Sequence, residues 1–266
     1  MIKIENVEVM GWEAAIRGMR NPMNSWKKSD SFCSSIEHCI NCSDKEHCDH
    51  YYSELGEGMP YRNGKNLPFH YLGTNDLNLM TRLRNAGTDH RKFMRMITVY
   101  LDIAAPLYWW KEFDTYKVGT VANSCSTMHK IHDKAFELTD FSYEHIIDSV
   151  DIKNEFFKET EIRLEEINKV SPWDLLRHSI ATLNFCREKY LQTKDKKYWW
   201  QIIQLLPSSY NQRRTVMLNY EVLANIYKSR RNHKLDEWVD FCEWIETLPY
   251  SELITGLLDG DDTNAN

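Results

Sequence analysis

Hydrophobic and polar positions alternate at the start of the chain. Across residues 1–10, isoleucines and valines are separated by polar residues, and this period of two predicts a short strand. A longer apolar and β-branched run, 96–103, predicts a second strand that breaks at Ala105-Pro106, because proline cannot donate to a sheet ladder. A binding loop rich in Ser, Thr and Asn is expected to follow.

Most other apolar residues recur at helical spacing. Residues 11–22 read as a helical turn, Asn75-Asp76 as the N-cap of a helix that stops at Gly87, and Ser171-Pro172 as a capped helix start. Ser124 to Leu138 is read as mixed turn and helix. Further helical segments are predicted over 141–170, 199–206, 215–227 and 235–248.

These elements predict an α/β (α+β) protein with a central, mostly antiparallel sheet flanked by helices and a helical C-terminal half. We expect a single domain over 1–258. Within it, 24–72 differs in composition, lacks periodicity and reads as a Cys-rich insertion. The polar residues 259–266 read as a flexible tail.

Composition narrows the class of protein. The net charge of −6 argues against a chain that coats nucleic-acid phosphates, so no direct nucleic-acid binding is expected. The first ten residues lack a signal-peptide core, and the apolar stretch 96–110 carries Asp102. We therefore expect a cytoplasmic protein without a membrane partner. Its nine Trp and fourteen Tyr suggest a packed core and subunit contacts.

Four of the seven cysteines lie within sixteen positions, and one pair forms a CxxC knuckle; the four are Cys33, Cys39, Cys42 and Cys48. Thiolates in this arrangement suit a tetrahedral zinc ion that would stabilise a small insertion. Free thiols and an iron–sulfur cluster remain alternatives.

The order of motifs around the second strand resembles the flavin-dependent thymidylate synthase family. Lys111-Glu112-Phe113 follows Ala105-Pro106 where the family has Arg-Gln-Trp, and Thr120 stands at the first Ser of its signature. The segment 83–93 matches an upstream family turn. The downstream matches are Leu206-Pro207, Asn219 and the run 230–237.

This resemblance implies FAD as cofactor, a pyrimidine deoxynucleotide and a folate as reactants, and a homotetramer with shared sites. In the family, methylenetetrahydrofolate supplies the methyl carbon and reduced FAD the hydride. It assigns FAD contacts to Arg91, Lys117, Asn123, Asn219 and His233. It assigns substrate contacts to Lys111, Glu112, Thr120 and Arg230, and the active-site serine to Ser126 or Cys125. His90, Arg91 and Arg95 would form a polar rim.

The chain departs from the family at its charged positions. The Arg-His-Arg triplet reads Thr115-Tyr116-Lys117, and neither register of the signature keeps its last arginine. Glu221 replaces the arginine of Asn-x-Arg, where the family holds the nucleotide phosphate. A changed substrate, a catalytically silent descendant and a zinc-stabilised scaffold are therefore the competing interpretations.

Overall fold

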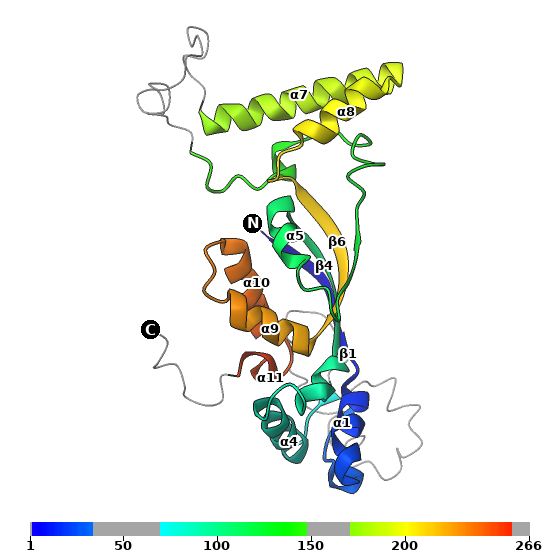
Figure 1. The fold of residues 1–266 in the computed structure, drawn as a ribbon, viewed down its shortest axis with the longest axis vertical. Coiled ribbons are helices and arrows are strands. Elements are labelled where there is room, and N and C mark those ends of the chain that lie inside the picture. The colour runs from blue at the N-terminus through cyan, green and yellow to red at the C-terminus, as the bar shows by residue number, and fades with distance from the viewer. Residues whose placement is uncertain (1, 34–69, 148–170, 257–266) are drawn as a thin grey trace, which may run out of the picture. The chain divides into compact units, whose positions relative to one another are not determined.

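A four-stranded antiparallel sheet organises the protein. The computed structural model describes residues 2–33, 70–147 and 171–256 (Figure 1). The strand order in the sheet is β1 (Lys3–Met10), β4 (Thr98–Pro106), β6 (Asn211–Asn219) and β5 (Val121–Ser124). A separate antiparallel pair joins β2 (Phe32–Cys33) to β3 (His70–Tyr71), with Cys33 opposite His70. The predicted combination of helices with an antiparallel sheet is confirmed.

The chain forms two compact units. Unit 1 comprises Met1–Glu5, Asp102–Tyr116 and Ala122–Val216, and its described helices are α5 (Leu107–Phe113), α7 (Pro172–Thr193), α8 (Lys196–Leu205) and the 3₁₀ helix η5 (Leu138–Asp140). Unit 2 comprises Asn6–Leu101, Lys117–Val121 and Met217–Asn266. Its described helices are α1 (Trp12–Arg20), α4 (Thr74–Asn85), α9 (Tyr220–Arg230), α10 (Asp236–Glu246), α11 (Glu252–Thr255) and the 3₁₀ helices η1 (Asn21–Met23), η2 (Trp26–Lys28) and η4 (Arg91–Arg95).

The helix predicted over 215–227 is wrong in its first part. Residues up to Asn219 belong to β6, where Val216 and Leu218 are buried at a spacing of two, as one face of a strand requires. The helix α9 starts only at Tyr220. Because the Asn219 side chain accepts a hydrogen bond from the Val222 N–H at 3.1 Å, it caps that start. The C-terminal half is therefore not purely helical.

The N-cap predicted at Asn75-Asp76 is also wrong. The helix α4 begins at Thr74 after Gly73, and the carboxylate of Asp30 accepts the N–H groups of Asn75 and Asp76 at 2.9 and 3.1 Å. A side chain distant in sequence thus satisfies donors that local capping normally satisfies. The predicted stop is confirmed, since Gly87 has a φ of 104° just beyond the helix end.

Of three further predicted elements, one start is confirmed, one strand is shifted and one helix is absent. The capped start at Ser171-Pro172 is confirmed, since Ser171 Oγ accepts from the Asp174 N–H at 2.9 Å. The strand predicted over 96–103 begins two residues later and extends to Pro106. The helix expected within 124–138 is wrong: apart from the end of β5 and the first residue of η5, this stretch is turns and coil.

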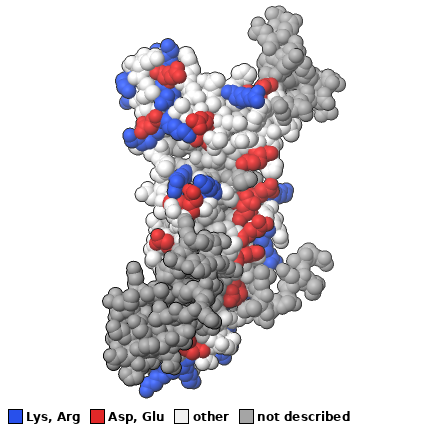
Figure 2. Space-filling view, turned by 180° about the vertical axis from the view of Figure 1, so that it is seen from behind, with Lys and Arg blue, Asp and Glu red and all other residues white. Residues whose placement is uncertain are grey.

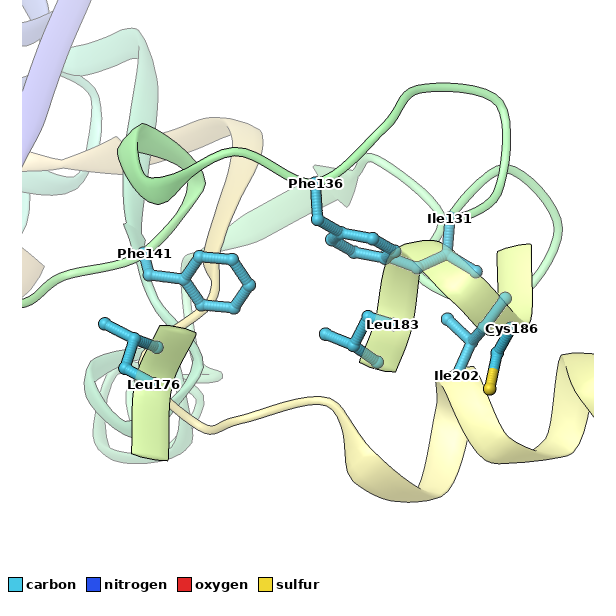
Figure 3. Packing of buried hydrophobic residues seen from close by; sticks show 7 residues of the cluster. All are labelled: Ile131, Phe136, Phe141, Leu176, Leu183, Cys186 and Ile202. Carbon is cyan, nitrogen blue, oxygen red and sulfur yellow. The ribbon is translucent and has the colours of Figure 1, made fainter. Parts of the chain in front are cut away.

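In unit 1, α7 and α8 lie side by side and bury apolar residues against the loop 131–141 (Figures 1 and 3). The cluster drawn in Figure 3 consists of Ile131, Phe136, Phe141, Leu176, Leu183, Cys186 and Ile202. The aromatic block after β4 forms α5, in which Trp109 and Trp110 are almost completely buried. These two tryptophans therefore serve the core, as the composition suggested.

In unit 2, one buried aspartate ties the start of α4 to the preceding loop. Asp76 is fully buried, and its carboxylate lies 2.6 Å from Arg20 Nη2. The same carboxylate accepts hydrogen bonds from the hydroxyls of Ser29 and Ser31, both at 2.6 Å. Burial alone would raise the pKa of Asp76, but the hydrogen bonds from Ser29, Ser31 and Arg20 outweigh it and lower that pKa. The charged Asp76 carboxylate therefore links the first turn of α4 to the loop before β2.

The predicted zinc site lies largely outside the described residues, since only Cys33 of its four cysteines belongs to them. Most of the proposed insertion, residues 148–170 of the helical segment predicted over 141–170, and the tail are outside them as well. The described part of that segment, 141–147, is turn and coil with one isolated β-bridge at Phe141, so no helix begins there. Across 2–33, 70–147 and 171–256, no group of three metal-ligating side chains occurs. Within these same ranges, no helix combines the length and apolar character needed to cross a membrane.

Candidate functional site

The start of α9 in unit 2 brings together two of the motifs that the sequence had placed far apart. The strand β6 delivers Asn219 to the helix start, and the loop of Lys117–Val121 lies against it. A Cβ added at Gly119 would lie 2.8 Å from Asn219 Nδ2 and 3.2 Å from Val222 Cγ2. Gly119 also has a φ of 79°, which disfavours a side chain. Its glycine thus permits the close approach of the loop to the capped helix.

Thr120, next to this glycine, presents an unsatisfied hydroxyl. Its Oγ1 is buried and finds no hydrogen-bond partner in the described part of the chain. A buried polar atom without a hydrogen-bond partner costs free energy and therefore needs an explanation. A ligand that forms the missing hydrogen bond would provide one. Lys117 is exposed two residues before Gly119, and no acidic partner for it occurs among the residues described.

Glu221, in the first turn of α9, binds two arginines from η4. Its carboxylate accepts from Arg95 Nε and, at 3.3 Å, from Arg95 Nη2, and it also lies 3.3 Å from Arg91 Nε. Arg91 donates in addition to Asn225 Oδ1 at 3.2 Å. The Glu221 side chain is only 10% exposed, whereas that of Arg95 is 53% exposed. The carboxylate therefore sits inside the cluster, and the arginines cover it.

The electrostatics of this cluster favour the charged carboxylate. Burial alone would raise the pKa of Glu221, but hydrogen bonding and attraction to Arg95, and then to Arg91, prevail and lower it. The pKa of Arg95 is raised, chiefly by its hydrogen bond to Glu221. A negative charge in the first turn also interacts favourably with the helix dipole. At neutral pH the three groups form an ionised network with one excess positive charge.

Arg230 is the last residue of the same helix, and His233 lies three residues beyond it. Arg230 Nη1 lies 2.9 Å from His233 Nε2, and its guanidinium stacks 4.8 Å from the centroid of Trp238. Nine residues of helix, a rise of about 14 Å, separate Arg230 from Glu221. The structure therefore does not gather these two predicted site residues at the α9 start.

The remaining predicted site residues belong to unit 1. Lys111 and Glu112 lie on α5, and Asn123 is exposed on β5. Cys125 has an exposed thiol, while its backbone pairs with Arg213 at 2.9 Å. Ser126 Oγ accepts the N–H groups of Met128 and His129 at 3.2 and 2.9 Å, so it closes a turn.

Sequence reasoning assigned no pairing to Glu221 and no role to Asn225. It treated Glu221 only as a departure from a motif and Arg95 only as part of a polar rim. The signal for a shared role was present: Glu221 and Asn225 are four residues apart and therefore neighbours on one helical face. Their common partner, Arg91, is 130 positions from Glu221, and no local pattern links them.

Lysine and arginine do not gather into a single basic patch on the face in Figure 2. On the described part of that face, they lie next to aspartate and glutamate side chains. Mixed charge of this kind is typical of an ordinary solvated surface. The expectation of no direct nucleic-acid binding stays a prediction.

Comparison with known proteins identifies the fold. No family model matches the chain, and neither does any curated protein sequence. Among solved structures, the flavin-dependent thymidylate synthase ThyX from Helicobacter pylori, complexed with FAD and dUMP, matches with a TM-score of 0.54 at 15% identity. The match covers 94% of this chain and 97% of that chain. A second structure of ThyX from the same organism, also with FAD and dUMP, gives 0.55 at 14% identity and covers 96% and 97%. The chain has a divergent ThyX-like fold.

Proposed function

We propose that the chain is a flavin-dependent thymidylate synthase-like protein. It would bind FAD and, with a folate, transfer a one-carbon unit to the pyrimidine ring of a deoxynucleotide or of an altered form of that substrate. The observation that carries this proposal is the start of α9, where the Lys117–Val121 loop, Asn219 and the arginines of η4 converge within one unit. The resemblance assigned these same segments to cofactor and substrate.

The residues at this place fit a phosphate-bearing cofactor. Thr120 offers a buried, unpaired hydroxyl, and Gly119 lets its loop lie close against Asn219 and Val222 at the start of α9. Lys117, Arg91 and Arg95 against Glu221 leave a balance of two positive charges. Because Glu221 already binds both arginines, we assign the contact with an FAD phosphate to Lys117, the exposed lysine two residues before Gly119. The flavin, when bound, would supply the reducing equivalent of the transfer.

The chain's own groups would then bind and orient the reactants. Asn219 holds the start of α9, and Thr120 can donate to an acceptor on a ligand. Ser126 and Cys125 stay candidates for the substrate side of the reaction, with Lys111 and Glu112 nearby in sequence. No enzymic nucleophile is required, so positioning is the main task of these side chains.

The test is flavin binding followed by turnover. The purified protein, titrated with FAD, should quench flavin fluorescence at about one FAD per chain. With methylenetetrahydrofolate, a reductant and deoxyuridylate or deoxyuridine, mass spectrometry should detect a methylated pyrimidine. If FAD does not bind and no product forms, the proposal fails.

A second candidate is a catalytically silent protein of the same fold that binds a nucleotide or flavin or acts in protein interactions. Two observations favour it: Glu221 occupies both arginines, and the Ser126 hydroxyl is already used to close a turn. In the experiment above, FAD binding without any methylated product would support this candidate instead.

We further propose that the protein is cytoplasmic. We also propose a homotetramer with sites shared between subunits, as the resemblance to the flavin-dependent thymidylate synthase family implies. The domain is proposed to be continuous over 1–258 with the Cys-rich insertion at 24–72. The pairing of Cys33 with His70 brings together two positions within that segment, on either side of most of its residues, which suits an insertion.

We predict about one zinc ion per chain, held by Cys33, Cys39, Cys42 and Cys48. Metal analysis of the purified protein tests this, and Cys39→Ser or Cys42→Ser should release the ion because each removes a thiolate ligand. Cys186→Ser is the matched control, since Cys186 lies in the unit 1 core. A protein free of metal, with melting unaltered by Cys42→Ser, would refute the zinc site.

A further inference from the structure

The helix α7 in unit 1 carries large apolar side chains both inside and outside the core. Leu176, Leu183 and Cys186 are buried in the cluster that α7 shares with α8. Leu175 and Phe185 lie outside that cluster and are 61% and 55% exposed. Single exposed apolar side chains are ordinary, whereas a group of them on one face marks an interaction surface. The positions of Leu175 and Phe185 along the helix decide between these two cases.

Leu175 and Phe185 belong to one stripe along α7. Four exposed residues, which we call the α7 stripe, follow one another at spacings of three, four and three: Leu175, His178, Thr182 and Phe185. This spacing keeps side chains on one helical face and is the pattern of a seam between two packed helices. The two large apolar side chains are about 15 Å apart, and the small side chains of Thr182 and the exposed Ala181 lie between them. A large side chain from a second helix therefore fits over the middle of the stripe.

Opposite charges flank the α7 stripe. Asp174 lies directly before it, and Lys189 follows it by four residues. The Lys189 amine lies 5.7 Å from the centroid of the Phe185 ring, and it forms no ion pair with a carboxylate of the described ranges. In an antiparallel pair of α7 helices that places Phe185 opposite His178, the shared centre lies between residues 181 and 182. Lys189 of one copy then falls opposite Asp174 of the other, so the charges are complementary, whereas a parallel pair would place like charges together.

We propose that the α7 stripe is a contact surface between two copies of this chain, which pack antiparallel about a two-fold axis beside Thr182. Because such a contact is isologous, Phe185 of each copy lies against the stripe of the other, and the pairing of Lys189 with Asp174 occurs twice. The inference goes beyond the proposed function, since the resemblance implies a homotetramer without naming a surface. It rests on that proposal only in expecting self-association. The stripe belongs to unit 1 and the α9 start to unit 2, so FAD binding is not part of the inference.

The first test is the particle mass, measured by light scattering at micromolar protein concentration. Phe185→Glu should halve the mass of the wild-type oligomer, because it places an unpaired charge in the contact between the two helices. Met23→Glu is the matched control. It introduces the same charge at an apolar side chain of unit 2 that is 79% exposed, and it should leave the mass unchanged.

The second test is cross-linking, which also reports the direction of the two helices. In the antiparallel pair, Thr182→Cys lies next to its own copy across the two-fold axis, so mild oxidation should join two chains through a disulfide at this position. Gln192→Cys is an exposed control at the end of α7, and its copies would be about 30 Å apart along the helix. It should not cross-link to itself. Peptide mass spectrometry distinguishes the new disulfide from any that the native cysteines form.

The outcomes separate this inference from the proposed homotetramer. If wild type and Phe185→Glu form oligomers of equal mass, the inference is wrong and the homotetramer stands on other surfaces. A monomeric wild type would overturn both. A disulfide through Gln192→Cys without one through Thr182→Cys would refute the antiparallel contact. Should Phe185→Glu unfold, as circular dichroism would show, the cross-linking of Thr182→Cys still decides the inference.

Discussion

Asp76→Asn should destabilise the protein by about 3–5 kcal/mol, the largest effect that we expect of a single polar substitution in unit 2. The wild-type carboxylate is fully buried against Arg20 and accepts from Ser29 and Ser31. An asparagine leaves the Arg20 charge buried without its counter-charge, and its amide cannot accept from all of these donors at once. Urea unfolding followed by circular dichroism measures the change.

The pH dependence gives an independent check on the same pair. The pKa of Asp76 is lowered in the folded state, so the carboxylate contributes stability above the ordinary aspartate range and loses it as the pH falls. The difference in the free energy of unfolding between wild type and Asp76→Asn should therefore shrink as the pH falls. Asp89→Asn, at an exposed position of the same unit, should cost less than about 0.5 kcal/mol. Equal stability of Asp76→Asn and wild type would contradict the buried ion pair.

Lys117→Ala should weaken FAD binding roughly ten- to a hundredfold. Lys117 is exposed directly before the Val118–Gly119 turn, and no carboxylate is paired with it in the described ranges. The loss of one charge-assisted phosphate contact costs on the order of 1.5–3 kcal/mol, which corresponds to that change in affinity. Fluorescence titration with FAD measures it directly.

Two other lysines serve as comparisons for this variant. Lys111→Ala, on α5, should weaken FAD binding less than Lys117→Ala, because Lys111 lies outside the triplet that matches the family. Lys92→Ala removes an exposed charge from η4 next to Arg91 and controls for a general loss of positive charge. Equal weakening by all three substitutions would show that the effect is not a specific contact of Lys117.

Elements that rely on local chemistry were predictable from sequence. The alternating residues of 1–10 form β1, and the capping pair Ser171 and Asp174 fixes the start of α7. In both cases the decisive partners lie within a few residues of each other, so a pattern in the sequence contains the whole interaction. The antiparallel sheet follows from the order of such elements together with the resemblance.

Elements that rely on distant partners were not predictable in the same way. Asp76 looked like a helix cap because aspartate favours that position. In the fold it forms a buried ion pair with Arg20, and Asp30 accepts the N–H groups at the helix start instead. Residues 215–219 looked helical because Val216 and Leu218 continue into an apolar helix. Pairing within the sheet decides instead that they form a strand.

The candidate site also combines residues that the sequence pointed to with contacts that only the fold reveals. The resemblance assigned Arg91, Lys117, Thr120 and Asn219 to cofactor and substrate, and this assignment stays a prediction. The structure does show that the Gly119 backbone lies close to Asn219. It could not give the partner of Glu221, because an arginine's role changes when a carboxylate reaches it from another part of the chain. The sequence shows that Glu221 stands where the family has an arginine. Only the fold shows that two arginines neutralise its charge.

The most direct test of the central claim is a crystal structure of the protein grown with FAD and deoxyuridine. The account predicts flavin density against the Lys117–Val121 loop at the start of α9, with a phosphate of FAD at Lys117 and Glu221 still bound to its arginines. A structure without flavin, or with the flavin away from this loop, would contradict the account.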